Sequence, residues 1–251
     1  MINYKLLQNS IEREKAGLDY MCPEIDKQVL SELFKDINKC TGIPVQYLAE
    51  IDAFNLSGAG SIMAEYMSEI SSQSVKCFLI PQIVEDKVTD CDKLLLSEYL
   101  SFKSSEEYIS PPGKSAPAYI YVRFDNAFRR LKSKRIADEL VDIVLSPRDA
   151  YYLPFTVRML AAWKKAELKN ALFRYALANC VSIQEIGIPE DGKTYFPSYP
   201  VICRELRFTA INALKYYPCD ETSNILEICM EDTDIDISNA ARKVKARIER
   251  M

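Results

Sequence analysis

Apolar residues recur at helical spacing through most of this 251-residue chain. In residues 168–176 they occupy positions i, i+3, i+4, i+7 and i+8, as Leu168, Ala171, Leu172, Tyr175 and Ala176. This spacing places the apolar side chains on one face of a helix, and that face must be buried against another element. The chain is therefore predicted to be all-α.

Similar stripes follow one another toward the C-terminus, separated by short breaks. Their members are Phe155, Met159, Leu160 and Trp163; Leu206, Ala210, Ala213, Leu214 and Tyr217; Ile225, Leu226, Cys229 and Met230; and Ile237, Ala240, Ala241, Val244 and Ile248. Pro218 is expected to end the helix before it, because proline lacks the N–H that another turn would need. Successive amphipathic helices of this kind bury their faces by stacking, which is typical of α-solenoids.

Glycine supports the helical prediction, because there are only seven and all lie between the apolar-periodic segments. Helix ends and turns are the places that require glycine. In the N-terminal part, helices are predicted over residues 4–16, 24–40, 44–54 and 62–71. The apolar run 75–84 carries Pro81 in its middle and leaves a strand, a kinked helix or a helix that begins near Pro81 as alternatives. Its helical neighbourhood favours a helix.

The amino-acid composition changes at two places along the chain. Residues 103–117 are rich in Ser and Pro, so they are predicted to link an N-terminal helical region, 1–102, to a region of helical repeats, 118–251. Residues 181–200 contain three prolines and two glycines and interrupt the repeats. This insertion is too long for an ordinary turn between paired helices.

Residues 116–251 resemble the HEAT-repeat family of helical hairpins. Phe155-Thr156 recurs as Phe208-Thr209, and Ala210 and Ala240 are thirty residues apart, a shorter period than the ~40 residues of HEAT repeats. The acidic turn 231–234 before the last stripe is also HEAT-like. The resemblance implies helical hairpins stacked as an α-solenoid and a habit of binding macromolecules, and it carries over no catalytic residue.

Several kinds of chemistry are disfavoured by composition. Histidine is absent, which removes the commonest general base and His-containing metal sites. The acidic run 232–236 starts like a calcium loop, but Ile237 and Lys243 stand where glycine and glutamate are needed. We therefore expect neither a metal nor a cofactor, and no catalytic residue is named.

The cysteines and the charge indicate a compartment and a class of partner. The eight cysteines form no Cys-x-x-Cys pair, and no export signal precedes the first helix, so reduced thiols in the cytoplasm are expected. No apolar run is long enough to span a membrane, so no membrane partner is expected. The net charge of −4 makes general nucleic-acid binding unlikely.

Two sets of residues are candidate partner contacts. In the insertion, Tyr195, Phe196 and Tyr199 are either recognition anchors or rings that cover the edge of the solenoid. The acidic residues Glu231, Asp232 and Asp234 would add complementary charge for a basic partner.

Two further features each have two interpretations. Arg123, Arg130 and Lys134 would share one helical face, which is either a site for an anion or acidic partner, or a solvated face paired with acids such as Asp138, Glu139 and Asp142. The glycine-rich turn 57–61 is either an anion-binding turn or the plain start of a helix. The absence of a following Lys-Ser/Thr pair favours the plain start.

The sequence is best interpreted as a non-enzymatic, cytoplasmic, protein-binding helical-repeat protein. A bacterial immunity protein that neutralises a basic toxin domain is one form of this function, drawn from charge and fold analogy. The alternative is a HEAT-like nucleic-acid-processing enzyme, such as an alkylbase DNA glycosylase. The single tryptophan, Trp163, lies in an apolar stripe and gives no sign of such an enzyme's base pocket.

Overall fold

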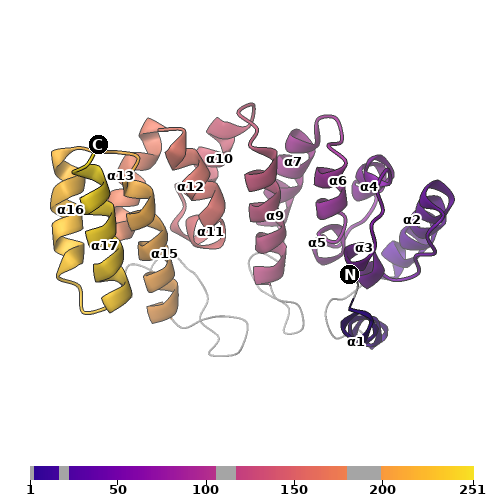
Figure 1. Cartoon of the computed structure of the whole chain (residues 1–251). Coiled ribbons are helices and arrows are strands. Elements are labelled where there is room, and N and C mark those ends of the chain that lie inside the picture. The colour runs from indigo at the N-terminus through magenta and orange to yellow at the C-terminus, as the bar shows by residue number, and fades with distance from the viewer. Residues whose placement is uncertain (1–2, 17–22, 106–116, 180–198) are drawn as a thin grey trace. The chain divides into compact units, whose positions relative to one another are not determined.

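The computed structural model describes residues 3–16, 23–105, 117–179 and 199–251 (Figure 1). All regular secondary structure in these ranges is α-helical, which confirms the all-α prediction for them. The chain divides into two compact units, residues 1–131 and 132–251. Each unit is described by itself below.

The first unit contains eight described helices. They are α1 (Tyr4–Lys15), α2 (Glu24–Thr41), α3 (Leu48–Ala53), α4 (Gly60–Met67), α5 (Gln73–Lys76), α6 (Ile80–Glu85), α7 (Cys91–Lys103) and α9 (Pro117–Leu131). The run 75–84 is thus divided between α5 and α6, and Pro81 stands in the first turn of α6, where its missing N–H costs nothing. The helical alternative for this run is correct.

Aromatic rings join α7 to α9. Tyr99 and Phe102 of α7 meet Tyr121, Phe124 and Phe128 of α9, all of them almost completely buried. The ring centroids of Tyr99 and Phe124 are 5.2 Å apart in an edge-to-face arrangement, a geometry that aromatic pairs favour. This cluster makes α9 part of the first unit, although the sequence-based division assigned it to the region after residue 117.

In the first unit, two carboxylates accept hydrogen bonds from backbone N–H groups at the starts of helices. Glu14 of α1 accepts hydrogen bonds from the backbone N–H groups of Leu48 (2.9 Å) and Ala49 (3.0 Å), at the start of α3. Asp26 of α2 is fully buried and accepts from the N–H groups of Ser71 (2.8 Å) and Ser72 (3.0 Å), just before α5. The first N–H groups of a helix have no partner within it, so these carboxylates supply one.

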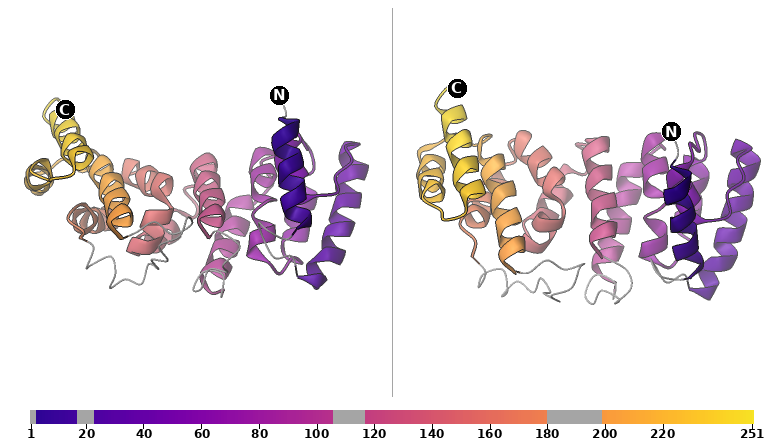
Figure 2. Two further views of the ribbon diagram at one scale, coloured as in Figure 1. Left: turned by 90° about the horizontal axis from the view of Figure 1, so that it is seen from below. Right: turned by 60° about the horizontal axis from the view of Figure 1, so that its bottom comes forward.

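The second unit contains seven described helices. They are α10 (Ala137–Val144), α11 (Pro147–Tyr152), α12 (Pro154–Ala162), α13 (Ala166–Ala176), α15 (Tyr199–Leu214), α16 (Asp220–Met230) and α17 (Ile235–Ile248). Within this unit α15 lies between α12 and α17, and it also packs on α13 (Figure 2). α13 in turn contacts α16, so α12, α15 and α17 form one layer and α13 and α16 a second.

The buried side of α12 differs from the predicted one. The apolar spacing predicts Phe155 on the buried stripe, but this residue is 37% exposed, whereas Thr156 is fully buried. The helix instead buries Leu153, Thr156, Val157, Leu160 and Ala161, which have ideal i, i+3, i+4, i+7, i+8 spacing. The prediction is wrong because residues 153–163 contain two patterns of helical spacing. The predicted one includes the large rings of Phe155 and Trp163, whereas the buried one includes Thr156.

Candidate functional site

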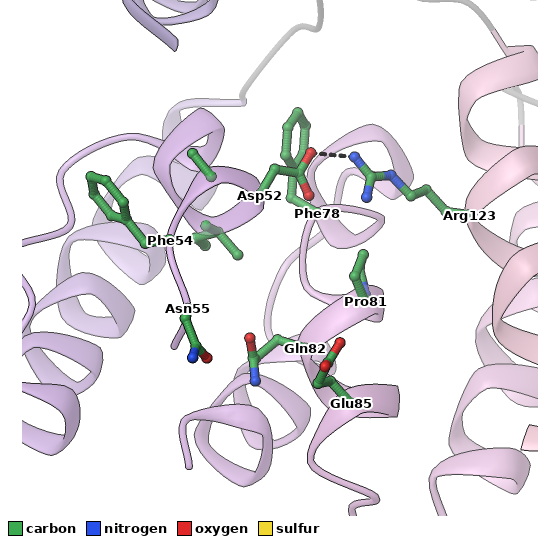
Figure 3. Close-up of a pocket in the computed structure, with 10 residues that line it drawn as sticks. Asp52, Phe54, Asn55, Phe78, Pro81, Gln82, Glu85 and Arg123 are labelled. Carbon is green, nitrogen blue, oxygen red and sulfur yellow. Dashed lines mark hydrogen bonds and ion pairs between the residues drawn. The ribbon is translucent and has the colours of Figure 1, made fainter. Parts of the chain in front are cut away.

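A polar pocket of about 540 Å³ lies in the first unit, among α3, α6 and α9 (Figure 3). Three segments supply its walls. They are Ile51, Asp52, Ala53, Phe54 and Asn55 at the end of α3; Phe78, Pro81, Gln82 and Glu85 on and before α6; and Arg123 on α9. Its volume is within the range of about 300–1,000 Å³ that ligand sites occupy.

Two arginines of α9 pair with carboxylates of this pocket. Arg123 forms an ion pair with Asp52 (Figure 3), and both side chains are partly buried, at 21% and 28% exposure. Arg130 lies 3.1 Å from Glu85 in a more exposed pair. Because the two arginines are seven residues apart on one helix, they lie on the same side of it. The sequence predicts that these arginines share one side of the helix, but it suggests Asp138, Glu139 and Asp142 as their acidic neighbours.

Lys134 does not belong to that face. α9 ends at Leu131, and Lys132 has a left-handed backbone with φ of 48°, so the chain changes direction before Lys134. The predicted three-residue face is therefore wrong for Lys134, which is part of the second unit. Asp138, one of the acids proposed as a neighbour, pairs instead with Lys165.

The glycine-rich turn at 57–61 holds an anion that belongs to the chain itself. Oδ2 of Asp86 accepts hydrogen bonds from the backbone N–H groups of Gly58 (2.9 Å) and Gly60 (2.7 Å). Oδ1 of the same carboxylate accepts from the side-chain amide of Gln82, over 2.9 Å. The turn is thus both the start of α4 and an anion-binding turn, and Asp86 fixes the orientation of a side chain that lines the pocket.

In the second unit, most of the acidic turn is engaged by arginines of α15. Asp232 pairs with Arg207, and Asp234 accepts a hydrogen bond from Nε of Arg204 over 3.0 Å. Nε of Arg207 also donates to the carbonyl of Ala176 at the end of α13, over 3.0 Å. These contacts join α15 to the turn before α17. Asp232 and Asp234 therefore have a structural role that requires no partner.

The structure describes only some of the remaining residues that are predicted to contact a partner. Glu231 is exposed and has no ion pair within the described ranges, so it remains available to a partner. Tyr195 and Phe196 lie outside the described residues. Tyr199 begins α15, but its side chain is also outside them. The binding roles given to these residues stay predictions.

Four large apolar residues of α12, α15 and α17 are exposed, which the apolar spacing did not predict. Phe208 is 39% exposed while Thr209 is 7% exposed, which repeats the arrangement of Phe155 and Thr156. Val201 of α15 and Ile235 of α17 are 43% and 72% exposed. We call Phe155, Val201, Phe208 and Ile235 the outer face of the second unit.

The cysteines that the structure describes form no disulfide: Cys40, Cys77, Cys91, Cys203, Cys219 and Cys229. Cys22 and Cys180 lie outside the described residues. Cys219 precedes α16 and its thiol is 3.3 Å from the hydroxyl of Thr222. Partial burial acts to raise its pKa, but hydrogen bonds from Thr222 and the charge of Lys169 outweigh burial and lower the pKa below its ordinary value.

Two searches of the described residues give negative findings. No group of three or more cysteine or carboxylate side chains there is arranged to hold a metal ion. No helix among them combines the length and the apolar character needed to cross a membrane.

Comparison with known proteins adds no relative. No protein-family model, no curated protein and no solved structure matches this chain.

Proposed function

We propose that this chain is a non-enzymatic protein-binding protein whose second unit is a short HEAT-like α-solenoid. The proposal is supported by the two layers of that unit, in which α15 lies between α12 and α17 and α13 contacts α16. In solenoids each repeat packs on its neighbours and leaves a continuous outer surface for binding. The offset of thirty residues from Ala210 to Ala240 relates α15 to α17, adjacent helices of one layer.

One observation carries the proposal: the repeated Phe-Thr pair exposes its ring in both helices. Phe155 and Phe208 are 37% and 39% exposed on neighbouring helices, and the threonine beside each is buried. A ring has a large area and few rotatable bonds, so it loses little entropy when a partner covers it, and such residues often anchor interfaces. Burial of these rings by a partner would also remove apolar surface from water.

The charge of the chain bears on the kind of partner. Acidic residues outnumber basic ones in residues 1–131, while the two kinds are nearly equal in residues 132–251. A basic partner, such as the toxin domain that an immunity protein would neutralise, would therefore be attracted mainly by the first unit. The outer face of the second unit would supply apolar contacts.

The test begins with identifying partners that the wild-type chain captures from its native host, followed by measuring their affinity with purified proteins. Replacement of both rings, Phe155→Ser and Phe208→Ser, is expected to weaken binding at least about tenfold, because two anchors are lost. The matched control is Leu100→Ser with Ile228→Ser, two exposed apolar residues outside the outer face.

Circular dichroism must show that both variants keep the helical content of the wild type. A double-phenylalanine variant that binds every partner with unchanged affinity would remove the outer face from the proposal. A parallel variant, Tyr195→Ala with Phe196→Ala and Tyr199→Ala, tests the contact predicted for the insertion and can fail independently.

A further inference from the structure

The pocket of the first unit is lined by two carboxylates. Asp52 and Glu85 supply them, and Arg123 supplies the one cationic side chain among its ten lining residues. All three come from the unit that holds the acidic excess of the chain. Arg130, which is not a lining residue, pairs with Glu85 and balances the second carboxylate, so a cationic ligand binds here by replacing one of the chain's own arginines.

The neutral amide of Gln82 extends the set of hydrogen-bond acceptors. Its NH₂ group donates to Asp86 over 2.9 Å, so the oxygen is the atom of this side chain that can serve a ligand. Gln82 is buried, and Asp86 is itself held by the N–H groups of Gly58 and Gly60. The acceptor is thus fixed in place before any ligand arrives, which lowers the entropy cost of binding.

The lining of the pocket includes two aromatic residues. Phe54 and Phe78 are half-buried lining residues on different segments (Figure 3). A guanidinium group is planar and weakly hydrated, so it stacks on aromatic rings while its N–H groups bind carboxylates. A compact ammonium group would use the rings less well.

The chain's own arginines demonstrate that these carboxylates accept guanidinium groups. Arg123 binds Asp52, and Arg130 binds Glu85 over 3.1 Å. The Arg130–Glu85 pair is the more exposed, with side chains 46% and 61% exposed, so it contributes little to folding and can be exchanged at low cost. We propose that the pocket is a guanidinium-binding site, where an incoming arginine-like group binds the oxygen of Gln82 and exchanges with Arg130 at Glu85 and with Arg123 at Asp52.

The experiment is a titration of the full isotope-labelled chain, followed by nuclear magnetic resonance, with Nα-acetyl-arginine amide. Nα-acetyl-citrulline amide is the matched ligand, since it has nearly the same shape without the charge. We expect resonances of the pocket residues to shift with the arginine compound, and the citrulline compound to bind at least about tenfold more weakly, because charge-assisted hydrogen bonds are lost.

Variants then connect the binding to the carboxylates. Asp52→Asn and Glu85→Gln are each expected to weaken binding of the arginine compound about tenfold. Glu65→Gln, an exposed acid of α4 outside the pocket, should leave it unchanged. Glu85 is the more exposed of the two carboxylates, so Glu85→Gln keeps the test decisive if Asp52→Asn disturbs folding.

Equal binding of the arginine and citrulline compounds, or unchanged binding in the Glu85→Gln variant, would overturn the proposal. A further arm distinguishes the source of the group. Tighter binding of free arginine identifies a small molecule, and tighter binding of a blocked arginine-containing peptide identifies a partner protein. These results concern the first unit alone, so they do not depend on the outcome at Phe155 and Phe208.

Discussion

The backbone nitrogen of Gly60 donates a hydrogen bond to Oδ2 of Asp86 over 2.7 Å, and the same two residues leave no room for a side chain between them. A Cβ atom added at Gly60 would lie 2.8 Å from the Cβ of Asp86 and 3.0 Å from the backbone oxygen of Gln82. The start of α4 and the end of α6 are therefore held together by a contact that requires glycine on one side and a carboxylate on the other.

Replacement of this glycine, Gly60→Ala, is expected to destabilise the first unit by about 1–3 kcal/mol, because the backbone must move to relieve the overlap. At an open helical position the same change would stabilise by up to ~1 kcal/mol, so the sign of the effect is informative. Urea unfolding measures it. Ser61→Ala, at the next and exposed position, should change stability by less than about 0.5 kcal/mol. A Gly60→Ala variant as stable as wild type would show that the contact is looser than described.

Substitution of the buried carboxylate of Asp26 is expected to lower the free energy of unfolding more than substitution of the exposed carboxylate of Glu24. It accepts hydrogen bonds from both the N–H and the hydroxyl of Ser71 and from the N–H of Ser72. Asp26→Ala removes the acceptor for all three donors and is expected to cost about 2–3 kcal/mol in the free energy of unfolding. Asp26→Asn keeps one oxygen and should cost less. Glu24→Gln, whose side chain is 87% exposed in the same helical turn, is the control and should have little effect.

Local periodicity explains what the sequence could predict of the fold. In the stripe predicted for α17, Ile237, Ala240, Ala241 and Val244 are buried and Ile248 is half-buried, and Pro218 follows the end of α15. The predicted buried side of α12 is wrong because two stripes overlap in its sequence, and the buried one includes Thr156. A count of the spacing from Leu153 onward would have favoured the correct side.

The candidate pocket could not be predicted, because its contacts join residues that are distant along the chain. Arg123 and Asp52 are separated by 71 positions, and Arg130 and Glu85 by 45. Periodicity shows which side of a helix is buried, but it does not identify the neighbour on the exposed side. The basic set in α9 was recognised, whereas its partners depended on how α3, α6 and α9 pack.

The hydrogen bonds of Asp234 predict a pH dependence for the second unit. Partial burial alone would raise its pKa, but the N–H groups of Asp236 and Ile237 and the nearby Arg204 together lower the pKa below its usual 3.8. A lowered folded-state pKa means that the stabilisation is complete above pH 3.8 and is lost as the pH falls through the folded value. Asp234→Asn keeps an N-capping oxygen but removes the charge.

The measurement for Asp234 is the free energy of unfolding from pH 6 to pH 2.5. The difference between wild type and Asp234→Asn should be largest at pH 6 and should shrink below pH 3.8. Glu231→Gln, in the same turn but exposed, should follow the wild-type curve. A difference that stays constant over the whole range would show that the charge of Asp234 does not contribute.

Cys219 is expected to react as a thiolate at lower pH than an ordinary thiol. Burial opposes ionisation, but hydrogen bonds from Thr222 and the charge of Lys169 outweigh it and lower the pKa of Cys219 below 9.0. Alkylation by iodoacetamide requires the thiolate, so the rate at Cys219, followed by peptide mass spectrometry, should reach half its maximum below pH 9.0. Lys169→Gln removes a positive charge and should move this midpoint to higher pH. Lys243→Gln, an exposed lysine on α17, is the control and should leave it unchanged. If the midpoint is the same in wild type and Lys169→Gln, the lysine does not stabilise the thiolate and hydrogen bonding by Thr222 alone must account for its reactivity.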